Sequence, residues 1–263
     1  MELRLYKSLW GMENGTLREN FRKIAAAGYT GVEAGVPSKE QRSEFTELLE
    51  EHGLTYIALI GTSEDHDHTF AEGVADAATL RPQLIISHSA RDAMDDDTQL
   101  RFFESALEVE RHHGIPIGHE THRHRAMFTP WTTSRLLSAL PDLKITADFS
   151  HWCCVCETLL EDQVDHLKIA FERTIHIHAR VGYAQGPQVP HPGAPEYAAE
   201  LAAHESWWRQ ILQARAEQGF TFTTLTPEFG PPGYMPTLPY SNQPVADLWS
   251  VCEWMKERLQ TNR

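Results

Sequence analysis

The sequence predicts a single α/β domain with the (β/α)8 TIM-barrel fold, covering residues 1–263. A short apolar or β-branched run followed by a segment with helical spacing recurs eight times along the chain. Alternation of this kind indicates a parallel sheet, and eight units in about 250 residues are typical of a closed barrel. A doubly wound open sheet would more often carry a glycine-rich first turn, and no G-x-G-x-x-G pattern occurs.

The first four units fill the N-terminal part of the chain. Strands are expected at 3–10, 29–36, 54–62 and 82–90, and helices at 17–28, 38–53, 68–80 and 97–113. The first helix ends at Gly28, a residue type that often terminates helices. The second helix opens on Ser38 with Gln41 three residues later, and this spacing predicts a capping box.

The last four units follow without any change of composition that would mark a linker. Strands are expected at 115–122, 143–151, 174–182 and 222–230, and helices at 131–140, 156–172, before Gly219 and at 245–259. A Gly- and Pro-rich segment, 182–197, follows directly on the seventh strand. It could form a lid or an oligomer contact, or a loop with no direct role.

Composition and charge exclude several classes of function. The chain has 41% hydrophobic residues and a formal charge of −14, from 37 acidic and 23 basic residues. An acidic excess argues against nucleic-acid binding, which normally needs a Lys- and Arg-rich face. No apolar run reaches the ~18 residues that span a bilayer, and the N-terminus lacks the pattern of a signal peptide. With four cysteines and no disulfide framework, a cytoplasmic location is expected.

The predicted strand ends carry the residues that indicate chemistry. The active sites of such barrels lie at the C-terminal ends of the strands. Strands five to eight end in G-H-E-T-H, A-D-F-S-H, H-I-H-A-R and T-P-E-F-G, and they supply four candidate ligands, Glu120, Asp148, His178 and Glu228. Three carboxylates and one imidazole suit Mn²⁺, Mg²⁺ or Co²⁺, with Zn²⁺ as an alternative. Without a cation, the carboxylates would repel one another.

Structural explanations compete with the metal site. A single Asp or Glu at a strand end is more often a helix N-cap or part of an ion pair, but four on consecutive strands are harder to explain in this way. His176 and His178 point to the same side of one strand, so either could be the imidazole ligand. Cys153 and Cys156 form a C-x-x-C without a second cysteine pair, which favours packing thiols in a helix over a redox or zinc site.

The combination of motifs resembles the xylose-isomerase-like barrels, the sugar phosphate isomerase/epimerase group. The resemblance rests on A-A-G-Y-T-G-V-E-A-G, I-G-H-E-T-H, D-F-S-H, H-I-H-A-R and P-E-F-G. It implies that Glu120, Asp148, His178 and Glu228 hold the metal, with His178 preferred over His176. It also implies that His151 contacts substrate and that Glu120 and Glu228 exchange a substrate proton. Ala126 and Ala184 stand where the 3-epimerases of this group have Glu and Arg, which disfavours a ketohexose 3-epimerase.

Further residues near the same mouth are candidate substrate contacts. Glu33 ends the second strand, where the resembling family often places a substrate-facing acid, and its alternative is a structural ion pair. Trp10 could form an apolar wall or belong to the core. His88 and His122 could contact hydroxyl groups. Arg180 could hold a carboxylate or form a salt bridge with a nearby acid.

The leading hypothesis is a divalent-metal-dependent isomerase or epimerase of a sugar or related polyhydroxy carbonyl compound, acting through an enediolate. One ion is expected, with Mn²⁺ first among the candidates, together with a small carbohydrate-like substrate. A homo-oligomer is left open. The same enediolate could eliminate a β-hydroxyl group, so a dehydratase or lyase is the alternative. An endonuclease-IV-like phosphodiesterase and a non-catalytic carbohydrate-binding barrel are weaker alternatives.

Overall fold

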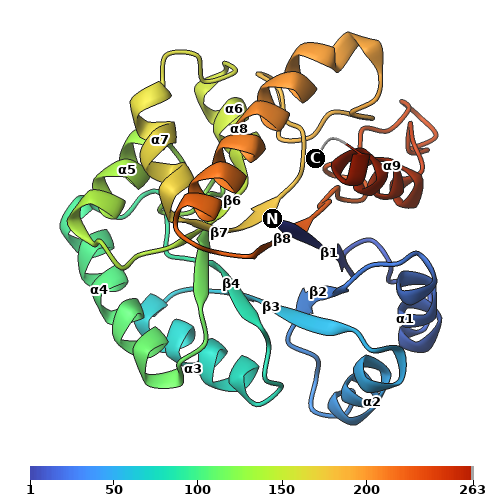
Figure 1. The fold of residues 1–263 in the computed structure, drawn as a ribbon, viewed down its shortest axis with the longest axis horizontal. Helices are drawn as coiled ribbons and strands as arrows, with labels where there is room; N and C mark the ends of the chain where they lie inside the picture. Colours follow the sequence, from blue (N-terminus) through green and yellow to red (C-terminus); the bar gives the residue numbers. More distant parts are fainter. Residues whose placement is uncertain (262–263) are drawn as a thin grey trace.

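A computed structural model, which describes residues 1–261, confirms the closed barrel (Figure 1). Within these residues, eight parallel strands pair in chain order and close between the last strand and the first. The strands are β1 Glu2–Ser8, β2 Gly31–Gly35, β3 Thr55–Gly61, β4 Leu84–His88, β5 Ile117–Glu120, β6 Ile145–Ala147, β7 Thr174–His178 and β8 Phe222–Thr226. The register of the closing pair sets Glu2 beside Phe222 and Leu5 beside Leu225.

Helices surround the strands on the outside of the barrel (Figure 1). They are α1 Leu17–Ala26, α2 Arg42–His52, α3 His66–Ala78, α4 Asp96–His113, α5 Pro130–Ala139, α6 Phe149–Cys156, α7 Val164–Arg173, α8 Ala198–Glu217 and α9 Leu248–Thr261, with the short 3-10 helix η1 Pro195–Tyr197. Across the described range, none combines the length and apolar character that a bilayer crossing requires.

The capping box predicted at Ser38 and Gln41 is wrong. Helix α2 begins four residues later than Ser38, and Gln41 is its N-cap without a side-chain hydrogen bond. Gln41 already has helical dihedral angles, and its N–H bonds to the carbonyl of Ser38 at 2.9 Å, so the backbone turn satisfies the donor. A capping box does form on α1, where Thr16 and Glu19 bond reciprocally.

The helix predicted at 156–172 is observed only from Val164 onward, as α7, and a separate helix, α6, precedes it at Phe149–Cys156. Helix α6 starts directly after β6, because the Asp148 side chain accepts a hydrogen bond from the Ser150 N–H and caps it. Glu157 then adopts a left-handed conformation with φ 54° and ends the helix. His151 and the C-x-x-C cysteines therefore lie on α6, and the predicted sixth strand is shorter than expected.

The interior of the barrel changes from apolar to polar along its axis. Tyr6, Ile57, Leu84 and Ile86 form a buried cluster, separate from the larger core in the helix layer. Close strand contacts demand a glycine at Gly31, where a Cβ atom would lie 2.2 Å from the carbonyl oxygen of Thr55. Beyond the apolar cluster, the C-terminal strand ends carry the ionisable side chains.

Candidate functional site

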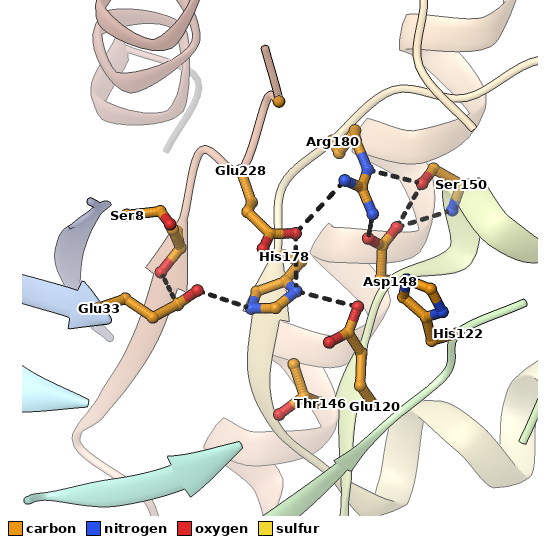
Figure 2. Close-up of polar contacts among 12 residues, drawn as sticks. Ser8, Glu33, Glu120, His122, Thr146, Asp148, Ser150, His178, Arg180 and Glu228 are labelled. Carbon is orange, nitrogen blue, oxygen red and sulfur yellow. Dashed lines mark hydrogen bonds and ion pairs between the residues drawn. The ribbon is translucent and has the colours of Figure 1, made fainter. Parts of the chain in front are cut away.

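The four predicted ligands converge at the C-terminal mouth of the barrel (Figure 2). Glu120 ends β5, Asp148 follows β6, His178 ends β7 and Glu228 lies two residues after β8. Each offers one ligand atom, and these atoms all lie within 4.8 Å of one another. All four side chains are buried. The closure of the barrel thus brings together residues that are up to 108 positions apart, from 120 to 228.

Several atoms of these four side chains that could bind a metal ion lack hydrogen-bond partners. His178 Nδ1 lies 3.1 Å from Glu228 Oε2 and 3.4 Å from Glu120 Oε1. These are ion-pair distances without hydrogen-bond geometry, and both His178 Nδ1 and Glu120 Oε1 are buried without a hydrogen bond. Unsatisfied buried polar atoms are costly. A divalent cation bound among them would satisfy both, and the oxygen-rich donor set fits such an ion.

Asp148 is also the N-cap of α6, so the structural explanation and the metal-site explanation both apply to it. Its Oδ1 accepts from the backbone N–H and the hydroxyl of Ser150, and Oδ2 pairs with the Arg180 guanidinium. Its own N–H donates to the hydroxyl of Thr121 at 2.8 Å. Burial raises the pKa of Asp148 to about 6, while Arg180 opposes the shift.

Arg180 is buried against the acids, in the ion pair that was the alternative to substrate contact. Besides pairing with Asp148, its Nε lies 3.1 Å from the Ser150 hydroxyl and one terminal nitrogen lies 2.7 Å from His151 Nε2. Its other terminal nitrogen lies 3.5 Å from Glu228. The acids raise the pKa of Arg180 against the opposing effect of burial. The guanidinium therefore neutralises part of the carboxylate charge.

Glu33 lies behind His178 rather than on the surface of the cavity. Its side chain is fully buried, with Oε1 at 3.3 Å from His178 Nε2 and Oε2 at 3.3 Å from His176 Nε2. The hydroxyl of Thr226 donates to Oε2 at 2.5 Å. Burial alone would raise the pKa of Glu33, but the two imidazoles outweigh it and hold that pKa below its ordinary value.

A cavity of about 490 Å³ opens above the four converging side chains. Among the predicted residues, Trp10, His88, Glu120, His122, Arg180 and Glu228 line it. Glu33, Asp148, His151 and His178 lie beneath or behind this lining. The remaining wall residues were not predicted, and they include Ser8, Leu9, Ala34, Leu59 and Tyr234.

Tyr234 is the main site residue that the sequence reasoning missed. Its ring packs edge-on against Trp10 at 4.9 Å between centroids, and the Arg180 guanidinium lies 4.8 Å from its ring centre. Its hydroxyl is 3.3 Å from His122 Nε2. The available signal was an aromatic residue in the Gly- and Pro-rich segment after the eighth strand. Gly230 in this segment is required, because a Cβ atom there would lie 2.1 Å from the Trp10 ring.

Two histidines, His88 and His122, border the cavity beside Glu120, and His151 lies behind His122. His88 Nε2 lies 2.6 Å from Glu120 Oε2, and the rings of His122 and His151 are 3.8 Å apart between centroids. His151 Nδ1 is buried without a hydrogen-bond partner. Burial would raise the pKa of Glu120, but His88 and His178 together hold that pKa well below its ordinary value, so the carboxylate is ionised.

The four cysteines are free thiols. Cys153 is buried in α6, where burial raises its pKa, and burial likewise raises the pKa of Cys156 to about 11. Neither thiol is activated as a nucleophile or ligand would be. Both lie on α6, as the packing interpretation of the C-x-x-C expects.

Comparisons with known proteins identify the fold and family. A family model described as Xylose isomerase-like TIM barrel matches residues 21–188, which is more than half of the chain. No curated protein matches the chain in a sequence comparison.

Solved structures with this fold carry several chemistries. The probable 3-DHS dehydratase AsbF from Bacillus anthracis has a TM-score of 0.65 and 16% identity, covering 99% of both chains. A xylose isomerase-like protein from Mycobacterium smegmatis, in complex with magnesium, has a TM-score of 0.63 and 11% identity, covering 97% of this chain and 95% of that one. A sugar phosphate isomerase/epimerase from Parabacteroides distasonis has a TM-score of 0.57 and 14% identity, covering 88% of each. Endonucleases are among the other matches. At these identities the likeness shows the fold.

Proposed function

The chain belongs to the xylose isomerase-like TIM barrel family, and from this premise we propose that it is a divalent-metal-dependent isomerase or epimerase of a sugar or related polyhydroxy carbonyl compound. The observation that carries the proposal is the convergence of three buried carboxylates and one imidazole at the barrel mouth, with unsatisfied donor atoms facing one point. The similar sugar phosphate isomerase/epimerase supports the reaction class.

The proposed cofactor is one divalent ion, Mn²⁺ first, with Mg²⁺, Co²⁺ and Zn²⁺ as alternatives. Glu120, Asp148, His178 and Glu228 would hold it, and these hard donors suit such ions. The magnesium complex of the similar mycobacterial barrel is consistent with this choice. When bound, the ion would supply Lewis-acid stabilisation of the charge that develops on the substrate oxygens during enolisation.

Glu120 and Glu228 are the proposed acid and base. Both line the cavity and both lie within 3.4 Å of the His178 ring nitrogen Nδ1. The ionised Glu120 carboxylate can remove a proton from the carbon next to the substrate carbonyl. The second glutamate, protonated before the reaction, can give its proton to the neighbouring carbon or to the opposite face, which gives isomerisation or epimerisation respectively, and it is left as the carboxylate.

Histidines and aromatic side chains would orient the substrate. His88 and His122 line the cavity, and His151 has a buried ring nitrogen available for a hydroxyl group. Trp10 supplies an apolar ring to the cavity wall. A polyhydroxy compound with one less polar face matches this arrangement. Arg180, whose nitrogens face protein partners, would act mainly by holding Asp148 and Glu228.

A dehydratase or lyase is the second candidate, and Tyr234 favours it. The Tyr234 hydroxyl and His122 lie 3.3 Å apart beside the cavity, where they could protonate a departing β-hydroxyl group. The likeness to the dehydratase AsbF points the same way. A phosphodiesterase is disfavoured by the charge of −14, and a non-catalytic barrel is disfavoured by the complete set of four ligand positions.

The test is solvent-deuterium exchange at the α-carbon of keto-sugars, keto-inositols and hydroxy-keto acids, in the presence of Mn²⁺. The proposal expects exchange with at least one compound in the wild-type protein and its loss in Glu228→Gln. A product formed by loss of water would select the dehydratase. The absence of exchange across the panel, or full exchange in Glu228→Gln, would contradict the enediolate mechanism.

A further inference from the structure

We propose that Glu33 is a positioning residue that makes Nδ1 of His178 the nitrogen available to the cation; the inference rests on the proposed metal site. Figure 2 shows Glu33 on one side of the His178 ring, with Glu120 and Glu228 on the other. Glu33 comes from β2 and His178 from β7, so the contact crosses the barrel interior. This assigns Glu33 a role different from the substrate contact that its strand-end position suggested.

Both oxygens of Glu33 are engaged away from the cavity. Oε1 lies 3.3 Å from His178 Nε2, an ion-pair distance without hydrogen-bond geometry, and Oε2 accepts from the Thr226 hydroxyl at 2.5 Å. Glu33 and His178 are fully buried, and Glu33 does not line the cavity. A carboxylate at the second nitrogen of a metal-binding histidine is the arrangement that orients such ligands and raises their basicity.

The hydrogen bonds behind Glu33 run in one direction. Thr226 gives its only hydroxyl proton to Glu33, so at 3.2 Å from His176 Nε2 it can only accept. His176 therefore carries its proton on Nε2, and its Nδ1 accepts from the Thr224 hydroxyl at 2.8 Å. The series of hydrogen bonds through Thr224, His176 and Thr226 therefore ends at the Glu33 carboxylate. This carboxylate offers His178 an acceptor and no proton.

The position of Glu33 matches one tautomer of His178. With a cation on the Nδ1 side, the proton of the neutral ring lies on Nε2, where it faces the carboxylate oxygen Oε1 of Glu33 at an ion-pair distance of 3.3 Å. In the neutral imidazole the lone pair is then on Nδ1, which faces Glu120 and Glu228 at 3.4 and 3.1 Å. The opposite tautomer would place a proton where the cation belongs and a lone pair against a carboxylate.

The test compares the Mn²⁺ affinity of wild-type protein with that of Glu33→Gln and Thr226→Val, measured by competition with a metal chelator. Loss of an outer partner of a metal-binding histidine typically weakens metal binding by about 10- to 100-fold, and Glu33→Gln should fall in this range. Thr226→Val, which keeps the shape of the side chain but removes the donor to Glu33, should lose less, about 10-fold or below. Glu104→Gln, which removes the same charge from the exposed surface of α4, should bind as wild type does.

A second readout follows the tautomer directly. In protein loaded with the diamagnetic ion Mg²⁺, ¹⁵N NMR of the His178 ring should show a protonated Nε2 in the wild type. That signal should shift or divide between tautomers in Glu33→Gln. A structural role for Glu33 in folding alone would lower the melting temperature without moving this signal.

Each outcome decides between the two proposals. If Glu228→Gln loses Mn²⁺ while Glu33→Gln keeps wild-type affinity and tautomer, the role of Glu33 is overturned and the metal site stands. If the wild-type protein binds no divalent ion, both proposals fall. Should Glu33→Gln not fold, Thr226→Val decides, and wild-type affinity in that variant would overturn the role of Glu33.

Discussion

The two halves of the barrel contribute different chemistry to one cavity. Strands β5 to β8 end in the four ionisable side chains of the candidate metal site. Strands β1 to β3 and the loops after them contribute a mostly apolar wall with Leu9, Trp10, Ala34, Gly35 and Leu59. His88 at the end of β4 marks the boundary, and it contacts Glu120 at 2.6 Å.

The difference shows in which half of the barrel several carboxylates are buried close together. Burying several carboxylates together is unfavourable unless positive charge or hydrogen bonds compensate. Arg180 pairs with Asp148, His88 contacts Glu120, and Nδ1 of His178 has no hydrogen-bond partner among the described residues. In the other half the buried carboxylate, Glu33 on β2, lies behind the cavity against His176 and His178, so the cavity wall there is mostly apolar and sets the shape of the cavity.

The largest effect is expected from a change in the charged half. Mn²⁺ at about 100 times its dissociation constant should stabilise the wild-type protein by about 2.7 kcal/mol. Asp148→Asn should weaken binding by more than about 100-fold, because loss of an outer partner already costs up to that amount. Thermal unfolding with and without Mn²⁺ measures both.

The matched control for that prediction lies on the apolar half. Glu13 lines the same cavity and accepts a hydrogen bond from the Gly11 N–H at 3.0 Å. Glu13→Gln should retain the Mn²⁺-dependent shift. An equal loss of the Mn²⁺-dependent shift in both variants would mean that Mn²⁺ binding depends only on the total negative charge around the cavity. That result would contradict the distinction between the halves.

Two glycines test how tightly each half is built. A Cβ atom at Gly31 would lie 2.2 Å from the backbone oxygen of Thr55, whereas at Gly118 its nearest contact is the hydroxyl of Thr146 at 2.4 Å. Gly31→Ala should cost about 3 kcal/mol or more of unfolding free energy, since backbone cannot yield easily, and Gly118→Ala about 1–3 kcal/mol. Urea unfolding of both variants checks the order. A larger cost at Gly118 would contradict it.

The pH dependence of stability tests a buried neutral histidine that lies behind β7, outside the charged half of the cavity. On α8, His204 Nε2 accepts from the Gly182 N–H at 3.2 Å, and burial lowers its pKa to about 4. Since the unfolded value is about 6.5, the unfolded chain binds more protons between these values. The contribution of neutral His204 to the free energy of unfolding is present above pH 6.5. It is lost as the pH falls, by up to about 3 kcal/mol near pH 4.

Chemical unfolding across pH 4 to 7 measures this contribution. His204→Gln, which keeps an acceptor but does not titrate, should show a shallower pH slope than the wild type. His112→Gln, at an exposed histidine of α4, serves as the control and should keep the wild-type slope. An unchanged slope in His204→Gln would show that other groups govern the acid sensitivity.

The smallest effect is expected at the C-x-x-C. Cys156 is a half-buried thiol in α6, away from the four ligand positions. Cys156→Ser should change the unfolding free energy by about 1 kcal/mol or less and leave the Mn²⁺ affinity unchanged. A large loss of bound metal in Cys156→Ser would revive the thiol-ligand interpretation.

Periodicity was enough to predict the barrel and the order of its strands. Each expected strand overlaps an observed one, because buried parallel strands require apolar runs that helical segments interrupt. The separate helix α6 at Phe149–Cys156 was not predicted, because Asp148 acts as its cap through local hydrogen bonds and Glu157 ends it by adopting positive φ. Neither property is visible in a hydrophobic pattern.

Convergence of the four acidic and imidazole positions followed from the geometry of a parallel barrel. The path of the loop that brings Tyr234 to the cavity did not, because loop conformation depends on contacts such as that between Gly230 and the Trp10 ring. The burial of Glu33 was equally hidden. A strand-end acid can face the cavity or its histidine neighbours, and only the three-dimensional partners distinguish them.

The central claim is that the charged half of the barrel holds one divalent ion. Elemental analysis of wild-type protein after reconstitution with Mn²⁺ and removal of excess ion tests it most directly, beside Glu120→Gln prepared in the same way. The account predicts about one equivalent of metal per chain in the wild type and nearly none in the variant. A wild-type protein without bound metal, or a variant that retains the full equivalent, would contradict it.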